Sequence, residues 1–288
     1  MGVMPLSGDE RVPPSAPGGP PTIALLHATY HRPGGVGPLR DAWLGRADRA
    51  DLVDYIVAMD GDDPAVRDTA GWHRVVGQPS DGTVSAVRNW NAAAAASSAD
   101  LLVVLADDLF PEPGWDTTLR RMLDGWDPQA VAYAVKITDS PDPDDALLRH
   151  PIVSRRFYVT SGLFAPQLRG AYCDDEITRR AYWRALILDG RRLAFDHAHP
   201  TLTGQVETTS HHLVNRDTEH ALGVRVYEGL WPKWRRRAAI RLAPTSGPLV
   251  GHPRAVRGLV LTRAAVDVAG WLVRAAVQRA EQVLRRRP

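Results

Sequence analysis

The stretch of sequence that decides the fold of this chain reads Ala99-Asp-Leu-Leu-Val-Val-Leu-Ala-Asp-Asp108. Its apolar run, from Leu101 to Ala106, is typical of a strand in the middle of a parallel sheet that is covered on both faces. The run ends at two adjacent carboxylates, Asp107 and Asp108. Parallel sheets bind ligands at the carboxyl ends of their strands, and carboxylates beside an apolar core are costly without a partner. A divalent metal with a phosphate ligand is one such partner, and a solvated acidic turn is the alternative.

Segments of strand and helix character alternate along the chain on both sides of this stretch. We expect further strands over 22–28, 52–59, 72–76, 130–137 and 192–195, and helices over 39–47, 84–98, 113–124, 174–188 and 255–287. This alternation predicts an α/β fold with a mostly parallel, Rossmann-type sheet flanked by helices.

Composition sets limits on the class of protein. The chain has 288 residues, 44% of them hydrophobic, which is enough to bury a sizeable core. A single cysteine, Cys173, excludes an internal disulfide framework and a cysteine-rich zinc site, and it fits a reducing cytosol. The sequence has no apolar run of about eighteen residues, so no membrane-spanning helix is predicted. Residues 1–21 are rich in proline, glycine and serine and predict a disordered leader.

The glycine-rich loop 31–38 matches no common phosphate-binding motif. A P-loop has lysine and then serine or threonine after its last glycine, where this chain has Pro38 and Leu39. A dinucleotide fingerprint that begins at Gly35 needs a third glycine at the position of Arg40. Glycines that only allow the loop to turn tightly are the simpler interpretation.

Four segments in sequence order carry a more specific signal. They are Ala28 to Arg32 (ATYHR), Tyr55 to Asp62 (YIVAMDGD), Ala86 to Asn91 (AVRNWN) and Leu105 to Trp115 (LADDLFPEPGW). In this order and spacing they resemble the motifs of the family 2 glycosyltransferases, which have the GT-A fold and use nucleotide sugars. The resemblance implies a GT-A-like domain over 22–230.

The resemblance also implies roles for particular residues. Those expected to bind the nucleotide-sugar donor are Thr29, Tyr30, Arg32, Asp60, Arg88, Asn89 and Asp107. Asp108 is the expected ligand of a divalent metal, Mn²⁺ or Mg²⁺, which would neutralise the diphosphate as it leaves. The family's Asp-x-Asp motif lacks its first acid here, because that position is Ala106. A surface arginine at Arg88 and a turn residue at Asp60 are the simpler interpretations.

Three consecutive acids begin the helix expected over 174–188. Acids in a first helical turn are stabilised by the helix dipole, which explains them without any catalytic role. An inverting transfer, however, needs one carboxylate to take the proton from the acceptor hydroxyl. By the resemblance that base is Asp175, and Asp174 is the alternative if the register slips by one residue.

Two histidines, His197 and His199, lie two positions apart in the segment after the last expected strand. Side chains at this spacing on a strand face the same side. By the resemblance one of them completes the metal site, and a structural role is the alternative.

The segment 231–288 is basic and predicts an amphipathic helical extension. Val266, Leu272 and Val277 fall on one face, and Arg263 and Arg274 on the other. The extension predicts either peripheral contact with an anionic membrane or packing on its own domain or a dimer partner. Nucleic-acid binding is not expected, because the basic residues are confined to this tail.

Together these observations predict an inverting, metal-assisted glycosyltransferase that takes a sugar from a nucleotide donor, a UDP-sugar by preference, to a glycan or glycolipid acceptor. A role in cell-envelope polysaccharide synthesis is expected, in the cytoplasm or peripherally on the inner face of the membrane. Two alternatives remain open. One is a non-catalytic relative that binds a glycan or nucleotide sugar, and the other is a metal-dependent hydrolase or nucleotidyltransferase.

Overall fold

The computed structural model describes residues 19–32, 35–80, 83–142, 144–198 and 216–285, with side chains as far as residue 279. Its centre is a sheet whose strands are β1 (Ile23–Ala28), β2 (Val53–Met59), β3 (Arg74–Val76), β4 (Leu101–Leu105), β5 (Leu109–Pro111), β6 (Tyr133–Thr138), β7 (Ile152–Ser154) and β8 (Leu186–His197). Their order across the sheet is β3-β2-β1-β4-β7-β6-β8-β5.

The sheet is mainly parallel. Strand β1 pairs in parallel with β2 and β4, β2 with β3, and β6 with β8. Strand β7 runs antiparallel between β4 and β6, and β5 runs antiparallel to β8. The predicted α/β class with a mostly parallel sheet is therefore confirmed.

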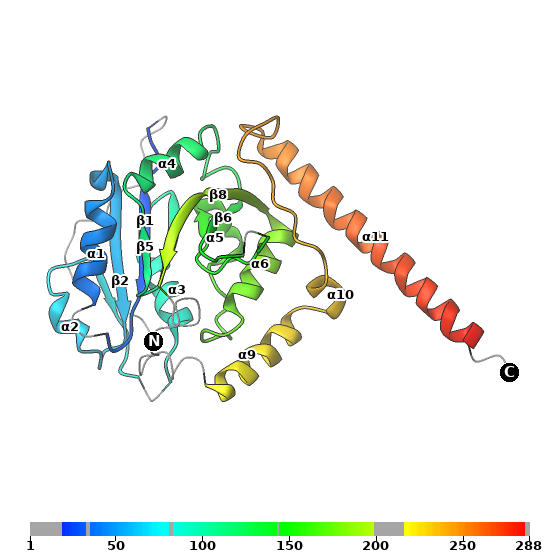
Figure 1. Ribbon diagram of the computed structural model, residues 1–288, viewed down its shortest axis with the longest axis horizontal. Helices are drawn as coiled ribbons and strands as arrows, with labels where there is room; N and C mark the ends of the chain where they lie inside the picture. Colours follow the sequence, from blue (N-terminus) through cyan, green and yellow to red (C-terminus); the bar gives the residue numbers. More distant parts are fainter. Residues whose placement is uncertain (1–18, 33–34, 81–82, 143, 199–215, 286–288) are drawn as a thin grey trace.

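Helices cover the sheet, as Figure 1 shows. They are α1 (Val36–Gly45), α2 (Ala65–Asp68), α3 (Ala86–Ala96), α4 (Trp115–Met122), α5 (Arg155–Ser161), α6 (Cys173–Arg184), α9 (Asp217–Leu230), α10 (Lys233–Arg236) and α11 (Pro253–Arg285), with a 3₁₀ turn at Ala50–Leu52. Successive strand residues alternate between two cores. In β1, Leu25 belongs to the same core cluster as Trp43 of α1, whereas Leu26 joins Ala93 of α3 and Ile177 of α6.

Strand β8 corrects the predicted helix over 174–188. Helix α6 ends at Arg184, and Leu186 already begins a strand of 12 residues that contains the short strand expected over 192–195. Alanine and aromatic residues at the end of α6 continue the apolar pattern into Leu186-Ile-Leu, so the sequence marks no boundary. Pairing of Leu186 to Leu188 with β6 determines the strand.

Short elements account for most of the structure that the sequence did not predict. Strands β5 and β7 have three residues each, too few for a periodic pattern to identify them. Helices α2, α5, α9 and α10 were also not expected. The remaining expected elements lie within a few residues of their predicted bounds.

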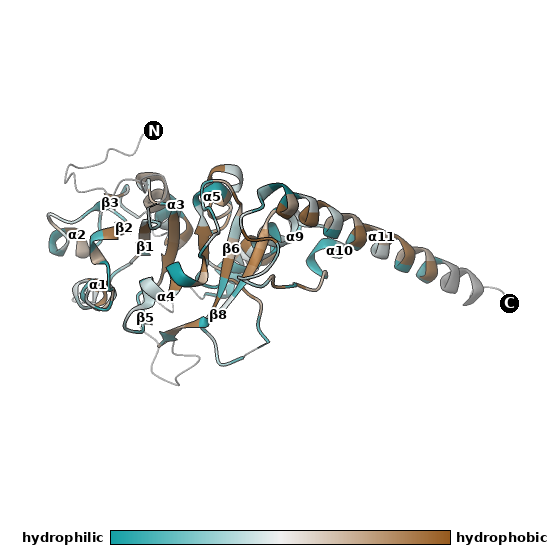
Figure 2. Cartoon of the chain, turned by 90° about the horizontal axis from the view of Figure 1, so that it is seen from above, coloured by the Kyte–Doolittle hydropathy of each residue, from teal (hydrophilic) through white to brown (hydrophobic). Residues whose placement is uncertain are grey.

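The chain after α10 returns to the sheet before α11 begins. The backbone N–H of Ala243 donates to the carbonyl of Ile187, and that of Asp189 donates to the carbonyl of Ala243, both at 2.7 Å. Val256 and Val260 in the first turns of α11 are buried in the same core cluster as Leu25 and Trp43. The later turns of α11 extend away from the rest of the chain (Figures 1 and 2). No helix in the described part of the chain is long and apolar enough to cross a membrane.

Candidate active site

A pocket of about 320 Å³ opens where β1 and β4 end. This is the edge of a parallel sheet at which ligands bind. Side chains from separate parts of the chain line it, including Thr29, Tyr30, Arg32, Asn89, Asp107, Asp108, Arg149, His150, Cys173, Asp174 and His197. The structure thus brings together eight of the twelve site residues expected from the sequence, namely Thr29, Tyr30, Arg32, Asn89, Asp107, Asp108, Asp174 and His197.

Asp107 is held in place by side chains from β1 and the loop after it. Thr29 Oγ1 donates to Asp107 Oδ1 at 2.9 Å, and the buried His27 Nε2 lies 2.9 Å from the same oxygen. The other ring nitrogen of His27 is 2.7 Å from the hydroxyl of Tyr55. Because a carboxylate accepts, Nε2 of a neutral His27 carries the proton and Nδ1 accepts from Tyr55. This chain of bonds fixes the orientation of Asp107 at the pocket.

Asp108 lies beside His197 at the pocket. His197 Nε2 lies 3.6 Å from Asp108 Oδ1, and both side chains are largely buried. The other nitrogen of the ring, Nδ1, is 3.1 Å from the backbone carbonyl of Asp139. A carbonyl can only accept, so Nδ1 carries a proton and the lone pair of neutral His197 is on Nε2, on the side of Asp108.

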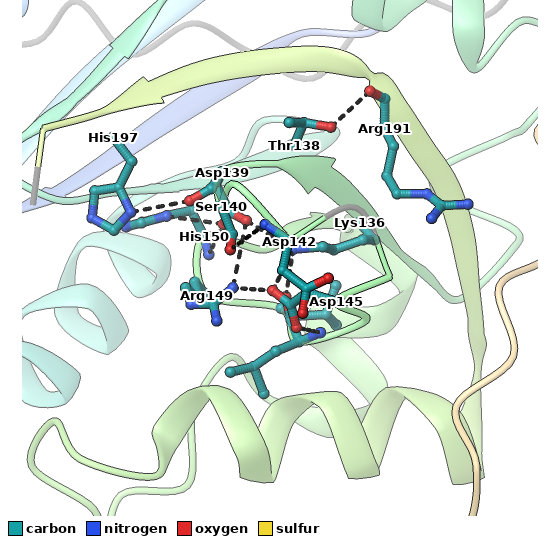
Figure 3. Close-up of polar contacts among 12 residues, drawn as sticks. Lys136, Thr138, Asp139, Ser140, Asp142, Asp145, Arg149, His150, Arg191 and His197 are labelled. Carbon is teal, nitrogen blue, oxygen red and sulfur yellow. Dashed lines mark hydrogen bonds and ion pairs between the residues drawn. The ribbon is translucent and has the colours of Figure 1, made fainter. Parts of the chain in front are cut away.

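Asp139 orients two histidines at once (Figure 3). Its carboxylate accepts from Nδ1 of His150 at 3.1 Å and from Nζ of Lys136 at 2.7 Å, while its carbonyl accepts from His197. The rings of His150 and His197 meet edge to face with their centroids 4.7 Å apart. Burial raises the pKa of Asp139, but the hydrogen bond and charge of His150, together with Lys136, outweigh it and lower that pKa to about 2.

This network could not be predicted from the sequence. Asp139 lies in a loop with several other aspartates, so nothing in the sequence distinguished it. Lys136 was the available signal, because a lysine within an apolar strand must find a buried partner. Arg149, which also lines the pocket, belongs to the same cluster through an ion pair with Asp145.

The residues at the pocket fit a divalent cation bound with a phosphate. Asp108 offers a hard oxygen and His197 a nitrogen whose tautomer is fixed by a second residue, as is usual for metal-binding histidines. Among the described residues, no three histidine, cysteine, aspartate or glutamate side chains are grouped to hold a metal. Mg²⁺ and its analogues are commonly bound by one or two carboxylates, with substrate phosphate and water completing the shell. His199, the other histidine expected here, lies outside the described residues.

The acidic pair at the start of α6 has unusual proton affinity. Asp174 lines the pocket, whereas Asp175 lies beside it and donates its backbone N–H to Asp174 Oδ1 at 3.0 Å. Burial raises the pKa of Asp174. Burial and the neighbouring charge of Asp174 raise the pKa of Asp175 to about 6. Two carboxyl groups that interact in this way titrate as a coupled pair, and their raised pKa values suit a general base.

Asp60 and Arg88 lie outside the pocket lining but contact each other. Arg88 donates to Asp60 Oδ1 at 2.8 Å from the first turn of α3. The other carboxylate oxygen of Asp60, Oδ2, is buried and has no hydrogen-bond partner among the described residues. A buried oxygen without a partner is costly, and a ligand N–H would satisfy it.

Two pocket segments hold their backbones in the left-handed region. His31 has φ 47° and Tyr172 has φ 67°, and they are the only non-glycine residues of the described chain with positive φ. Their neighbours in the chain line the pocket: Tyr30 and Arg32 on either side of His31, and Ala171 and Cys173 on either side of Tyr172. Backbone strain of this kind costs about 1–3 kcal/mol per residue and is typical of functional sites.

Comparison with known proteins gives a likeness of fold. No protein-family profile matches the sequence, and no curated protein matches it. Among solved structures, residues 1–349 of S. aureus TarS match with 11% identity and a TM-score of 0.50, covering 74% of this chain and 73% of that one. The same part of TarS in complex with UDP-GlcNAc matches with 12% identity and a TM-score of 0.48, covering 72% and 71%.

A third structure is the mannosyltransferase PcManGT from Pyrobaculum calidifontis in complex with GDP-Man and Mn²⁺. It matches with 14% identity and a TM-score of 0.47, over 96% of this chain and 83% of that one. At such identities the likeness concerns the fold alone, and it rests on the TarS structure at 0.50. The GT-A-like architecture expected from the sequence motifs agrees with it.

Proposed function

We propose that this chain is a glycosyltransferase that transfers a sugar from a nucleotide-diphosphate donor, with inversion, to a glycan or glycolipid acceptor. One observation carries the proposal. The pocket at the ends of β1 and β4 combines a carboxylate–histidine pair, Asp108 and His197, with a second acidic pair of raised proton affinity on α6. The likeness of the fold to TarS supports it.

The donor occupies the side of the pocket formed by the ends of β1 and β4. Thr29, Tyr30, Arg32 and Asn89 surround the nucleotide diphosphate, with Asp107 held toward the ribose by His27. The base lies toward the ion pair of Asp60 and Arg88, where the unpartnered Oδ2 of Asp60 accepts a hydrogen bond from it. A UDP-sugar is the first donor to test.

Asp108 and His197 are the residues that would hold a divalent metal, Mg²⁺ or Mn²⁺, beside the donor diphosphate. When bound, this ion supplies Lewis-acid neutralisation of the charge that develops as the nucleotide leaves. Arg149 and His150, which line the pocket beside the pair, add positive charge or hydrogen-bond donors on the same side.

The transfer itself is a single displacement. Asp174 takes the proton from an acceptor hydroxyl, whose oxygen forms a bond to the anomeric carbon as the bond from that carbon to the phosphate oxygen breaks. Attack opposite the leaving group inverts the anomeric configuration. Burial raises the pKa of Asp174, so this carboxylate receives the proton more readily than an exposed aspartate would.

A calorimetric titration tests the proposal. Nucleoside diphosphates are titrated in turn with Mn²⁺ and then with EDTA, into the natural chain and into Asp108→Asn. We expect one nucleotide to bind only in the presence of Mn²⁺. We expect this Mn²⁺-dependent binding to be abolished in Asp108→Asn. The matched control is Asp196→Asn, an exposed carboxylate on β8 next to His197, which retains binding. If no nucleotide binds to the folded chain, the proposal is wrong.

A further inference from the structure

The outer face of α11 is apolar and uncovered, although the helix begins inside the core. Its large apolar residues are between 41% and 63% exposed, and they are Leu259, Leu261, Val266, Leu272, Val273 and Val277. Small residues fill the gaps between them. At 3.6 residues per turn these side chains share about half of the helix circumference over about 30 Å of its length. Figure 2 shows apolar segments recurring along α11 beyond the rest of the chain.

Charged residues are absent from the middle of this outer face and lie on the other side of the helix and near its two ends. Between Gly258 and Gln278 the only charged residues are Arg263, Asp267 and Arg274, and at helical spacing all three lie on the opposite side. Before and after this stretch the flanks carry arginines. Arg254, Arg257 and Arg279 are exposed, and none has an ion-pair partner among the described residues.

The body of the chain holds α11 in one orientation. Arg263 donates to the backbone carbonyls of Tyr182 and Ala185 at the end of α6, and Tyr182 donates to Asp267 at 2.7 Å. The rings of Trp234 and Trp271 pack together with centroids 5.3 Å apart. These contacts use the side of α11 that faces the body, so the apolar side remains exposed.

We propose that the outer face of α11 lies on an anionic lipid bilayer, with its apolar side chains in the interface and its flanking arginines at the headgroups. Charge decides between this partner and a second copy of the chain. Residues 253–285 contain six arginines and two acids, so two such helices side by side repel each other. An anionic bilayer offers the opposite charge and an apolar layer at the depth that an amphipathic helix occupies.

Vesicle co-sedimentation with the full chain tests this. We expect binding to phosphatidylcholine vesicles that contain phosphatidylglycerol, weaker binding to phosphatidylcholine alone, and loss of binding as ionic strength rises. The double variant Leu272→Glu/Val273→Glu places two charges on the outer face and weakens binding about tenfold or more. Replacing Arg254, Arg257 and Arg279 by Gln weakens binding to the anionic vesicles by about two orders of magnitude, at about fivefold per arginine.

The matched control is Val159→Glu, which places the same charge at another exposed valine, on α5. It leaves vesicle binding unchanged. Light scattering after size exclusion, without lipid, measures the oligomeric state of the same samples. Two results would overturn the proposal. The first is that the natural chain and Leu272→Glu/Val273→Glu bind equally well to anionic vesicles. The second is that neither protein binds to vesicles, while the natural chain is a dimer without lipid and the variant is a monomer.

Discussion

Two histidines at the pocket depend on one residue for their orientation. The carboxylate and the carbonyl of Asp139 accept from His150 and His197 respectively, so a single residue selects the tautomer of both rings. Such second partners of a metal-binding histidine strengthen the ligand because they fix the ring and increase its basicity. The site therefore extends beyond the residues that line the pocket.

We predict that Asp139→Asn weakens Mn²⁺ binding in the presence of nucleotide by about tenfold, because it removes the carboxylate charge that holds His150 and Lys136, while the backbone carbonyl that accepts from His197 remains. Electron paramagnetic resonance of free Mn²⁺ measures this affinity directly. The matched control is Asp145→Asn, which removes a carboxylate from the same cluster that contacts Lys136 and Arg149 but neither histidine. Equal losses in the two variants would show that only the charge of the cluster matters.

The acidic pair on α6 gives a prediction that separates its two members. Asp174→Asn should reduce the rate of transfer by about 10²–10⁴-fold while nucleotide binding persists, because Asp174 is the member that lines the pocket. Asp175→Asn should retain far more of the rate. The measurement is single-turnover transfer alongside calorimetric nucleotide binding. The reverse order of the two effects would make Asp175 the base.

The same pair determines how the rate depends on pH. A carboxylate base works only when ionised, so we expect the rate to rise with pH through the pKa of the pair, near 6 for Asp175. Repulsion between two carboxylates acts on both, so Asp175→Asn should remove a negative charge beside Asp174 and lower its pKa. The acidic limb of the pH profile should therefore move to lower pH. A limb that stays in place would exclude coupling between the two groups.

At the scale of elements, α6 contains a buried ion pair whose arginine also binds the end of α5. Arg180 of α6 donates to Glu176 one turn earlier and to the backbone carbonyls of Ser161, Gly162 and Leu163, where α5 ends. Both side chains are buried. A buried charge that loses its partner is strongly destabilising, whereas removing both charges together is much less so.

We therefore predict that Arg180→Met lowers the free energy of unfolding by about 3–5 kcal/mol, because it leaves the carboxylate of Glu176 and three carbonyls without their donor. Urea titration of tryptophan fluorescence measures the loss. The double variant Arg180→Met/Glu176→Leu should recover part of it. A double variant as unstable as the single one would show that the carbonyls, and not the ion pair, determine the cost.

How far the sequence predicts the elements depends on how much of their pattern is local. Strand β4 could be predicted because its apolar run and the acids after it are recognisable from the local sequence alone. The boundary between α6 and β8 could not, because Leu186 becomes strand only through pairing with β6. The site divides in the same way. Asp107 and Asp108 follow a strand, whereas the bonds of Asp139 to two histidines exist only in three dimensions.

At the scale of the whole molecule, α11 consists of two parts with different roles. Its first turns contribute Val256 and Val260 to the core, and Arg263 attaches it to α6. Its outer face carries the exposed apolar residues, most of them in the later turns. None of the pocket-lining residues belongs to α11, so the helix can serve stability and surface contact without altering the site.

Two truncations separate these roles. Ending the chain after Gln278 should leave the unfolding midpoint and nucleotide binding nearly unchanged, because the core residues of α11 all precede that point. Ending it before Pro253 removes Val256 and Val260 from the core and should cost at least about 3 kcal/mol, at about 1.5–3 kcal/mol per buried valine. Denaturant titration and calorimetry with nucleotide measure both effects. Equal stability of the two shortened chains would mean that α11 does not pack on the sheet in solution, and its outer face would then have no fixed orientation toward a membrane.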